Sequence, residues 1–529
     1  MNSGATQPLL EQAELASPRT EQERRGALAA TAVALGGAPL IGIFIVHFGR
    51  LQFGGFDMSV LIDVGWRLYK GQRLYADFLC TLPVGFCLGA KYAFCLLGVE
   101  WSSQLYLAAA FAVVTYLWSY PLLSRLIASR LGAAATAVAI QCFVNLSVCY
   151  WWYGPITSMA ATLFVLSSAL WIRARQSWLA QLSWPLSLAL LAAAKPNVAG
   201  LLIVGVIAVM FATNSVGRVR LLLVGAGTAA LGVAALVALG ISPFELMSSY
   251  AMARGRVAPH LELSIYAMGA VDKIIAVPAL IGLGWPVAAC LVRDLRRVRE
   301  LSPEDRSFRA VLYVGAAVAL WAMLTNAELK FVDMPMLAVA GVVLYSRGAR
   351  AGEMGAGRSQ GLAGLLAATL CWVALVALYL GAIRYRVEGI GYGEFYEPEL
   401  AADAPGVRFF ASMRTGPRFP RVVAEIKDAL AQPGTGTVFF GPRMEWGYAA
   451  FNLASPEHLP LWWHRGSSYA VADEAEIFNR WRQQKFSTLI FLKDDLTCHP
   501  FYDFLPLVQG DYDRDDSFPN ITVFRRVVR

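Results

Sequence analysis

Long apolar runs separated by short polar segments recur through most of this chain. Each run of roughly 17–25 residues is long enough to cross the ~30 Å hydrocarbon core of a bilayer as a helix. Of the 529 residues, 57% are hydrophobic and only 16% are charged, and the mean hydropathy is +0.51. Soluble domains carry about 25% charged residues. The sequence therefore predicts a polytopic α-helical membrane protein.

The basic residues between the runs predict how the spans are oriented. We expect 11 spans, beginning at about 27–48 and continuing at about 104–124, 131–149, 156–173, 179–194, 197–213, 221–240, 274–292, 310–326, 331–346 and 362–384. With the N-terminus inside, every inside loop carries arginine, as the positive-inside rule expects. These arginines are Arg125, Arg130, Arg173, Arg175, Arg218, Arg220, the 293–309 cluster, Arg347, Arg350 and Arg358. The net charge of +8 is therefore not a nucleic-acid signal.

The apolar run at 82–97 decides this topology. It is short for a span and contains Lys91, and counting it as a span would move every one of those arginines to the outside. We therefore expect it to lie along the membrane interface.

Polarity also predicts the domain boundaries. Residues 1–26 are polar and lack a signal-peptide pattern, so they are expected to form a cytoplasmic tail. The transmembrane domain is expected at 27–387, with an outer loop at 49–103. The apolar runs stop after residue 388, and a soluble extracytoplasmic α/β domain is expected at 388–529. Its expected helices are 420–432 and 473–484, and its expected strands are 437–440, 487–492 and 521–527.

A polar stretch in the first outer loop runs from Gly54 to Pro83. Carboxylates at the rim of a bilayer are costly unless they are solvated, paired or used. Asp57 follows Gly55-Phe56 and opens an amphipathic helix predicted over residues 57–70. Its carboxylate suits either a helix N-cap or a general base at the membrane surface, with the glycines allowing close approach of a substrate.

Two further carboxylates of this loop have alternative roles. Asp63 is expected to pair with Arg67, one helical turn later. Asp77, beside Tyr75, either hydrogen-bonds a polyol substrate or fixes the loop.

Cations in the predicted outer loops are candidates for binding an anionic substrate. Lys195 lies beside the helix-breaking Pro196 and either binds a lipid phosphate or extends to the interface. The other candidates are Arg254, Arg256, His260 and Lys330. The first three face carboxylates of the 241–273 loop, where a solvated charged loop would look the same, and Lys330 can pair with Glu328.

The 8 cysteines and 5 histidines show no metal-ligand spacing. We therefore predict neither a zinc site nor a disulfide scaffold.

Several residues of the first outer loop together form a family pattern. These residues are Asp57, Gly71, Tyr75, Asp77, Phe78 and Pro83. They resemble the run of an aspartate, a glycine, Tyr-x-Asp-Phe and a proline pair in polyprenyl-phosphate-sugar-dependent glycosyltransferases of the GT-C fold, which include protein mannosyltransferases and lipid A aminoarabinose transferases. Met58 stands where an acidic residue is usual, and Leu82 replaces the first proline, so the resemblance is to the fold group rather than to one subfamily. Lys195-Pro196 resembles a Lys-Pro turn of the same group.

The resemblance implies a reaction and its substrates. Asp57 would be the base that deprotonates an acceptor hydroxyl, which would attack the anomeric carbon with inversion. Lys195, with Arg254, Arg256 or Lys330, would hold the leaving lipid phosphate. The donor would be a polyprenyl-phosphate sugar and the acceptor a glycan, lipid or protein. Some relatives use a divalent metal, although nothing in this sequence demands one.

Two other classes of function compete with this one. A lipid-linked sugar transporter or flippase would place polar residues near the bilayer midplane, whereas here they gather at the outer rim. A non-catalytic membrane binding protein would tolerate loss of Asp57. The arginine-rich, cysteine-poor sequence favours a bacterial inner membrane, with the N-terminus cytoplasmic and the C-terminus outside.

Overall fold

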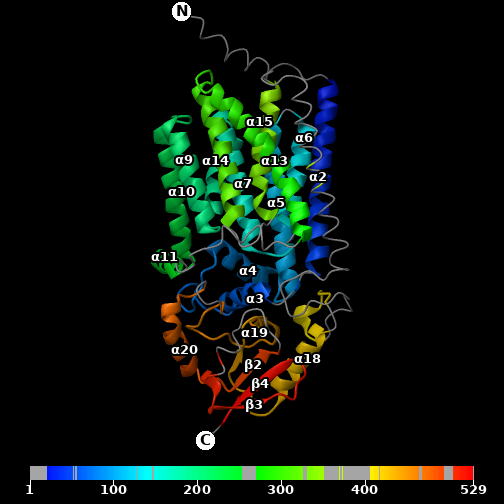
Figure 1. The fold of residues 1–529 in the computed structure, drawn as a ribbon, viewed down its shortest axis with the longest axis vertical. Coiled ribbons are helices and arrows are strands. Elements are labelled where there is room, and N and C mark those ends of the chain that lie inside the picture. The colour runs from blue at the N-terminus through cyan, green and yellow to red at the C-terminus, as the bar shows by residue number, and fades with distance from the viewer. Residues whose placement is uncertain are drawn as a thin grey trace, which may run out of the picture.

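The computed structural model describes residues 21–51, 53, 56–127, 129–145, 148–252, 270–325, 331–350, 369, 372, 406–415, 418–463, 468–493, 504 and 506–527. Figure 1 shows a bundle of long helices at one end and a C-terminal region, residues 406–527, at the other. Two shorter helices lie between them.

The bundle consists of helices at the positions of the predicted spans. They are α2 (Glu21–Gly49), α5 (Trp101–Leu126), α6 (Arg130–Asn145), α7 (Tyr153–Arg173), α8 (Trp178–Ala192), α9 (Pro196–Ala212), α10 (Arg218–Ala238), α13 (Ala270–Arg296), α14 (Pro303–Thr325) and α15 (Pro335–Arg350). The expected span at 362–384 lies outside the described residues, apart from Thr369 and Trp372. The predominantly helical fold is therefore confirmed, while the number of spans stays a prediction.

Burial differs sharply between helices of similar composition. Among the described residues, 4 helices are long and apolar enough to cross a membrane: Trp101–Leu126, Tyr153–Arg173, Arg218–Ala238 and Val277–Arg296. The apolar window of α7 is 100% buried, whereas that of α10 is 6% buried. An exposed helix that is apolar on all sides is stable where hydrocarbon covers it. Helix α7 is thus the centre of the bundle, and α10 lies on its outside (Figure 1).

Helices α3 (Phe56–Tyr69) and α4 (Val84–Leu97) lie between the bundle and the C-terminal region (Figure 1). They correspond to the predicted amphipathic helix at 57–70 and the predicted interfacial run at 82–97. The two helices pack closely, because a Cβ atom added at Gly65 would lie 3.1 Å from the Cβ of Ala90. A further short helix, α11 (Pro243–Met252), follows α10.

The C-terminal region contains one mixed four-stranded sheet in the order β1-β2-β4-β3. The strands are β1 (Val438–Phe440), β2 (Thr488–Leu492), β3 (Tyr512–Asp515) and β4 (Ile521–Arg526), and only the β1–β2 pair is parallel. The helices are α18 (Arg418–Ala431), α19 (Trp446–Ala450) and α20 (Glu474–Gln483). Short 3-10 helices occur in this region at Arg408–Phe410 and Val471–Asp473, and another precedes α15 in the bundle, at Phe331–Asp333. Both predicted helices and the three predicted strands are present, and β3 and α19 are additional.

Candidate active site

Helix α3 carries the residue expected to act as the base. Asp57 lies in the first turn of α3. The structure describes its backbone but not its side chain, and Gly54 and Gly55 lie outside the described residues. What the structure defines is therefore how α3 is held, and by which residues.

The predicted pair Asp63–Arg67 is confirmed, and it is fully buried. The Nε of Arg67 lies 2.7 Å from Oδ2 of Asp63, and the two residues are 1% and 0% exposed. Ser455 donates a hydrogen bond of 2.6 Å to the other carboxylate oxygen, and Arg67 donates to the backbone carbonyl of Pro456. Burial raises the pKa of Asp63, and the Arg67 guanidinium opposes that rise.

A second buried contact joins the start of α3 to α19. The hydroxyl of Ser59 donates a hydrogen bond of 2.6 Å to Oε2 of Glu445 and accepts one of 3.0 Å from the backbone N–H of Trp446. Glu445 is 2% exposed, and burial raises its pKa to about 8. Sequence reasoning missed Glu445, and its only signal was a lone carboxylate between Met444 and Trp446 in an apolar segment.

Asp77 is held within its own loop. Its carboxylate lies 2.8 Å from Nη2 of Arg73 and accepts a hydrogen bond of 2.7 Å from the backbone N–H of the same residue. The Arg73 hydrogen bonds lower the pKa of Asp77. The geometry thus agrees with a loop-fixing role, and direct contact of Asp77 with a substrate stays a prediction.

The backbone beside Asp77 pairs with the C-terminal region. Leu79 forms a parallel bridge with Pro460: its N–H donates to the carbonyl of Leu459, and its carbonyl accepts from the N–H of Leu461. The N–H of His458 donates to the carbonyl of Asp77 over 2.6 Å. The loop after α3 is therefore hydrogen-bonded to a segment almost 400 residues later in the chain. Helix α3 is hydrogen-bonded to the same part of the chain through Asp63 and Ser455.

Tyr75 is 8% exposed and has a positive φ of 68°. Its hydroxyl donates a hydrogen bond of 2.7 Å to the carbonyl of Leu82, and its ring centre lies 6.3 Å from that of Tyr250 in α11. Burial raises the pKa of Tyr250 to about 12, so this phenol is neutral. In this structure Tyr75 fixes the turn before α4, and its expected contact with substrate stays a prediction.

Lys195 lies in the turn between α8 and α9. Pro196 opens α9, the backbone N–H of Lys195 donates to Oγ1 of Thr157 over 3.2 Å, and its ammonium lies 5.8 Å from the centre of the Tyr153 ring. Two residues earlier, the carbonyl of Ala193 accepts a 3.0 Å hydrogen bond from the N–H of Gly85, in the first turn of α4. The structure thus brings Lys195 close to the end of the Tyr75–Pro83 loop.

The remaining predicted cations lie outside the described residues: Arg254, Arg256, His260 and Lys330. Helix α11, just before the first three, is described, and the hydroxyl of Ser249 donates to the carbonyl of Cys80. Among the described residues, no group of three or more His, Cys, Asp or Glu side chains is arranged to hold a metal ion.

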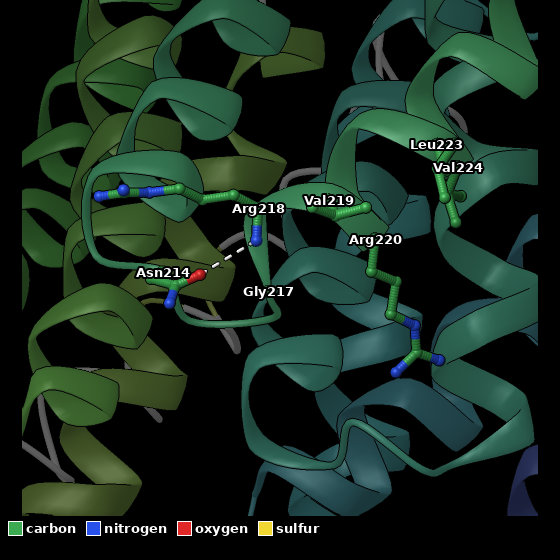
Figure 2. Close-up of a pocket in the computed structure, with 7 residues that line it drawn as sticks. All are labelled: Asn214, Gly217, Arg218, Val219, Arg220, Leu223 and Val224. Carbon is green, nitrogen blue, oxygen red and sulfur yellow. Dashed lines mark hydrogen bonds between the residues drawn. The ribbon is translucent and has the colours of Figure 1, made fainter.

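An open pocket of about 700 Å³ lies at the turn between α9 and α10. Its arginines, Arg218 and Arg220, point in different directions (Figure 2), and each lies over an aromatic ring, that of Phe211 and of Trp171 respectively. The 17 residues of α9 separate this turn from Lys195, which corresponds to ~25 Å of helix. The pocket is therefore remote from the candidate site.

No protein-family model matches this sequence, and no curated protein matches it either. Solved structures do match. The fold is similar to that of ArnT, an aminoarabinose transferase from Cupriavidus metallidurans, with a TM-score of 0.53, 11% identity, and coverage of 95% of this chain and 98% of that one. It is also similar to the Archaeoglobus fulgidus oligosaccharyltransferase, with a TM-score of 0.47, 13% identity, and coverage of 87% and 68%. The likeness to ArnT along nearly the whole chain shows that this integral membrane protein has the GT-C fold.

Proposed function

We propose that this protein is a membrane glycosyltransferase that moves a sugar from a polyprenyl-phosphate donor to an acceptor hydroxyl. The observation that carries the proposal is the GT-C fold combined with the family pattern between Asp57 and Pro83. This pattern falls on α3 and on the loop between α3 and α4. The acceptor is a glycan, a lipid or a protein.

In the proposed reaction, Asp57 accepts the proton of the acceptor hydroxyl as its oxygen attacks the anomeric carbon. The bond between that carbon and the phosphate oxygen breaks, the configuration inverts, and the polyprenyl phosphate leaves. Lys195, with Arg254, Arg256, His260 or Lys330, stabilises the charge that develops on the phosphate. The position of Lys195 near the first turn of α4 supports this assignment.

The proposed orientation places the C-terminal region, α3 and α4 on the outer face of a bacterial inner membrane. It follows the arginines of the predicted inside loops. The donor then reaches the site from the outer leaflet. The scheme requires no metal, and transfer measured with and without a chelator tests whether this chain uses a divalent ion, as some members of the resembled group do.

The test is transfer by the purified full-length protein from a panel of polyprenyl-phosphate sugars. We expect Asp57→Asn to lower the rate by about 10²–10⁴-fold, the usual contribution of a general base. Asp428→Asn, at an exposed carboxylate on α18, is the matched control and should transfer at the wild-type rate. Transfer that survives Asp57→Asn would move the base elsewhere, and a folded protein that binds donor without transfer would favour a transporter or binding protein.

A further inference from the structure

One face of α3 carries polar residues that contact the C-terminal region. Ser59, Asp63 and Arg67 are spaced four residues apart, so they lie on the same side of the helix. All three are at most 1% exposed. Trp66 and Lys70 extend this face. The indole N–H of Trp66 donates a hydrogen bond of 2.8 Å to the carbonyl of Leu453, and the ammonium of Lys70 lies 3.2 Å from Oδ1 of Asn452.

The other side of α3 is apolar. Leu61, Gly65 and Leu68 are spaced four and three residues apart and so lie on one side of the helix, where the two leucines are buried, at 0% and 4% exposure. This side packs with α4, since a Cβ added at Gly65 would lie 3.1 Å from the Cβ of Ala90. Helix α3 is therefore held between α4, through apolar packing, and the C-terminal region, through hydrogen bonds.

The polar side is an expensive way to fasten a helix. Taking a carboxylate and a guanidinium out of water costs several kcal/mol per ion, and apolar residues of similar volume often give equal or greater stability. Hydrogen-bonded polar groups nevertheless fix the position of a helix more narrowly than apolar packing does, because each donor must meet its acceptor at a set distance and angle. Here Asp63 receives hydrogen bonds from Arg67 and Ser455, and the Arg67 guanidinium also lies 5.1 Å from the centre of the Phe78 ring.

We propose that the C-terminal region positions Asp57 for catalysis by fixing α3 through two buried contacts, Ser59–Glu445 and Asp63–Ser455. In this arrangement Ser59, Asp63, Glu445 and Ser455 are positioning residues, because they act on the reaction only through α3. The inference rests on the proposed function. It assigns the C-terminal region a part in the chemical step rather than only in acceptor recognition.

The distances make this coupling direct. Asp57 precedes Asp63 by six residues, which is ~9 Å along an α-helix, and both lie within the one continuous helix α3. A misplacement of ~1 Å at a reacting group can cost about 100-fold in rate. Releasing one contact should therefore lower kcat more than it affects donor binding.

The first experiment compares serine variants in the full chain with the same donor panel. We expect Ser455→Ala and Ser59→Ala to lower kcat by about 10–100-fold while KM for the donor stays within about twofold. Ser455→Thr, which keeps the hydroxyl, should restore most of kcat. Ser183→Ala is the matched control, because Ser183 is also buried and accepts a 2.9 Å hydrogen bond from Trp118 within the bundle. Equal effects of Ser183→Ala and Ser455→Ala would overturn the proposal, as would a Ser455→Thr variant no better than Ser455→Ala.

The second experiment does not depend on activity. Hydrogen exchange of the amides of residues 56–69 should be faster in Ser455→Ala than in wild type and unchanged in Ser183→Ala. Unchanged exchange in Ser455→Ala means that the C-terminal region does not hold α3, and the inference fails. If wild type transfers no sugar at all while the exchange behaves as expected, the proposed function fails and the fastening of α3 stands, so the two failures can be told apart.

Discussion

The two ends of the molecule both bury charged groups, but they pair them differently. Next to the C-terminal region, Asp63 and Arg67 pair within one helix, and their distant partners are a hydroxyl and a backbone carbonyl. At the far end of the bundle, Asp294 of α13 pairs across to Arg309 of α14 as well as with its neighbour Arg293, and it accepts a 2.6 Å hydrogen bond from Tyr313.

This difference separates two uses of a buried ion pair. When both charges lie on one helix, each cancels the other's charge. Their remaining hydrogen-bonding atoms then form a polar surface, which neutral groups of another segment can bind in one geometry. A pair between helices fixes which helices are neighbours. We therefore expect the Asp63–Arg67 pair to control the position of α3 and the Asp294–Arg309 pair to control the stability of the bundle.

The largest effect is expected from Asp63→Leu. It leaves the Arg67 guanidinium buried without its counter-charge, which costs about 3–5 kcal/mol of stability. Thermal unfolding of the purified protein measures that loss. The double variant Asp63→Leu/Arg67→Leu should recover most of the stability but not the transfer rate, because the apolar pair no longer fixes one geometry. A double variant with wild-type kcat would show that the pair is packing alone.

The next effect is a dependence of folding stability on pH, which tests the role of Glu445. Its pKa is raised from 4.5 to about 8 in the folded protein. Between these values the unfolded state releases the proton and the folded state keeps it, so stability is greatest below about pH 4.5 and declines as the pH rises to 8. At ~1.36 kcal/mol per pKa unit the decline reaches at most about 5 kcal/mol. Glu445→Gln should remove this slope, and an unchanged slope in that variant would assign it to other groups.

A smaller effect is expected from Asp294→Leu at the far end of the bundle. It should cost about 3 kcal/mol, the lower end for a buried pair, because the two arginines that lose Asp294 keep some exposure, 16% for Arg293 and 9% for Arg309. The decisive measurement is kcat per folded molecule, which should equal that of wild type. A loss of kcat as large as that of Ser455→Ala would erase the distinction between the two ends.

The smallest stability effect is expected from Asp77→Asn. Arg73 is 67% exposed in this pair, and such surface pairs contribute little to stability because water screens them. The lowered pKa of Asp77 means that this contribution is present at neutral pH and is lost as the pH falls through its folded value. Because stability barely changes, any large change in KM for donor or acceptor would report a contact of Asp77 with substrate.

Local patterns predicted the parts of the site that depend on neighbours in sequence. The spacing of Asp63 and Arg67 predicted their pairing, and hydrophobic periodicity located α3. The partners Glu445 and Ser455 could not be found this way, since a contact across almost 400 residues leaves no local spacing to detect. Strand β3 was missed for another reason: Tyr512–Asp515 is an edge strand of mostly charged residues, which local propensity assigns to a loop.

The long separation between the partners also sets an order of assembly. Ser455 follows Asp63 by 392 residues, and at ~5–20 residues per second a ribosome needs ~20–80 s to make that segment. Throughout this interval α3 and its loop exist without the hydroxyl that completes their polar face and without the backbone partner of Leu79. A polypeptide that stops before Ser455 would contain every residue of the family pattern and still have an unfinished α3.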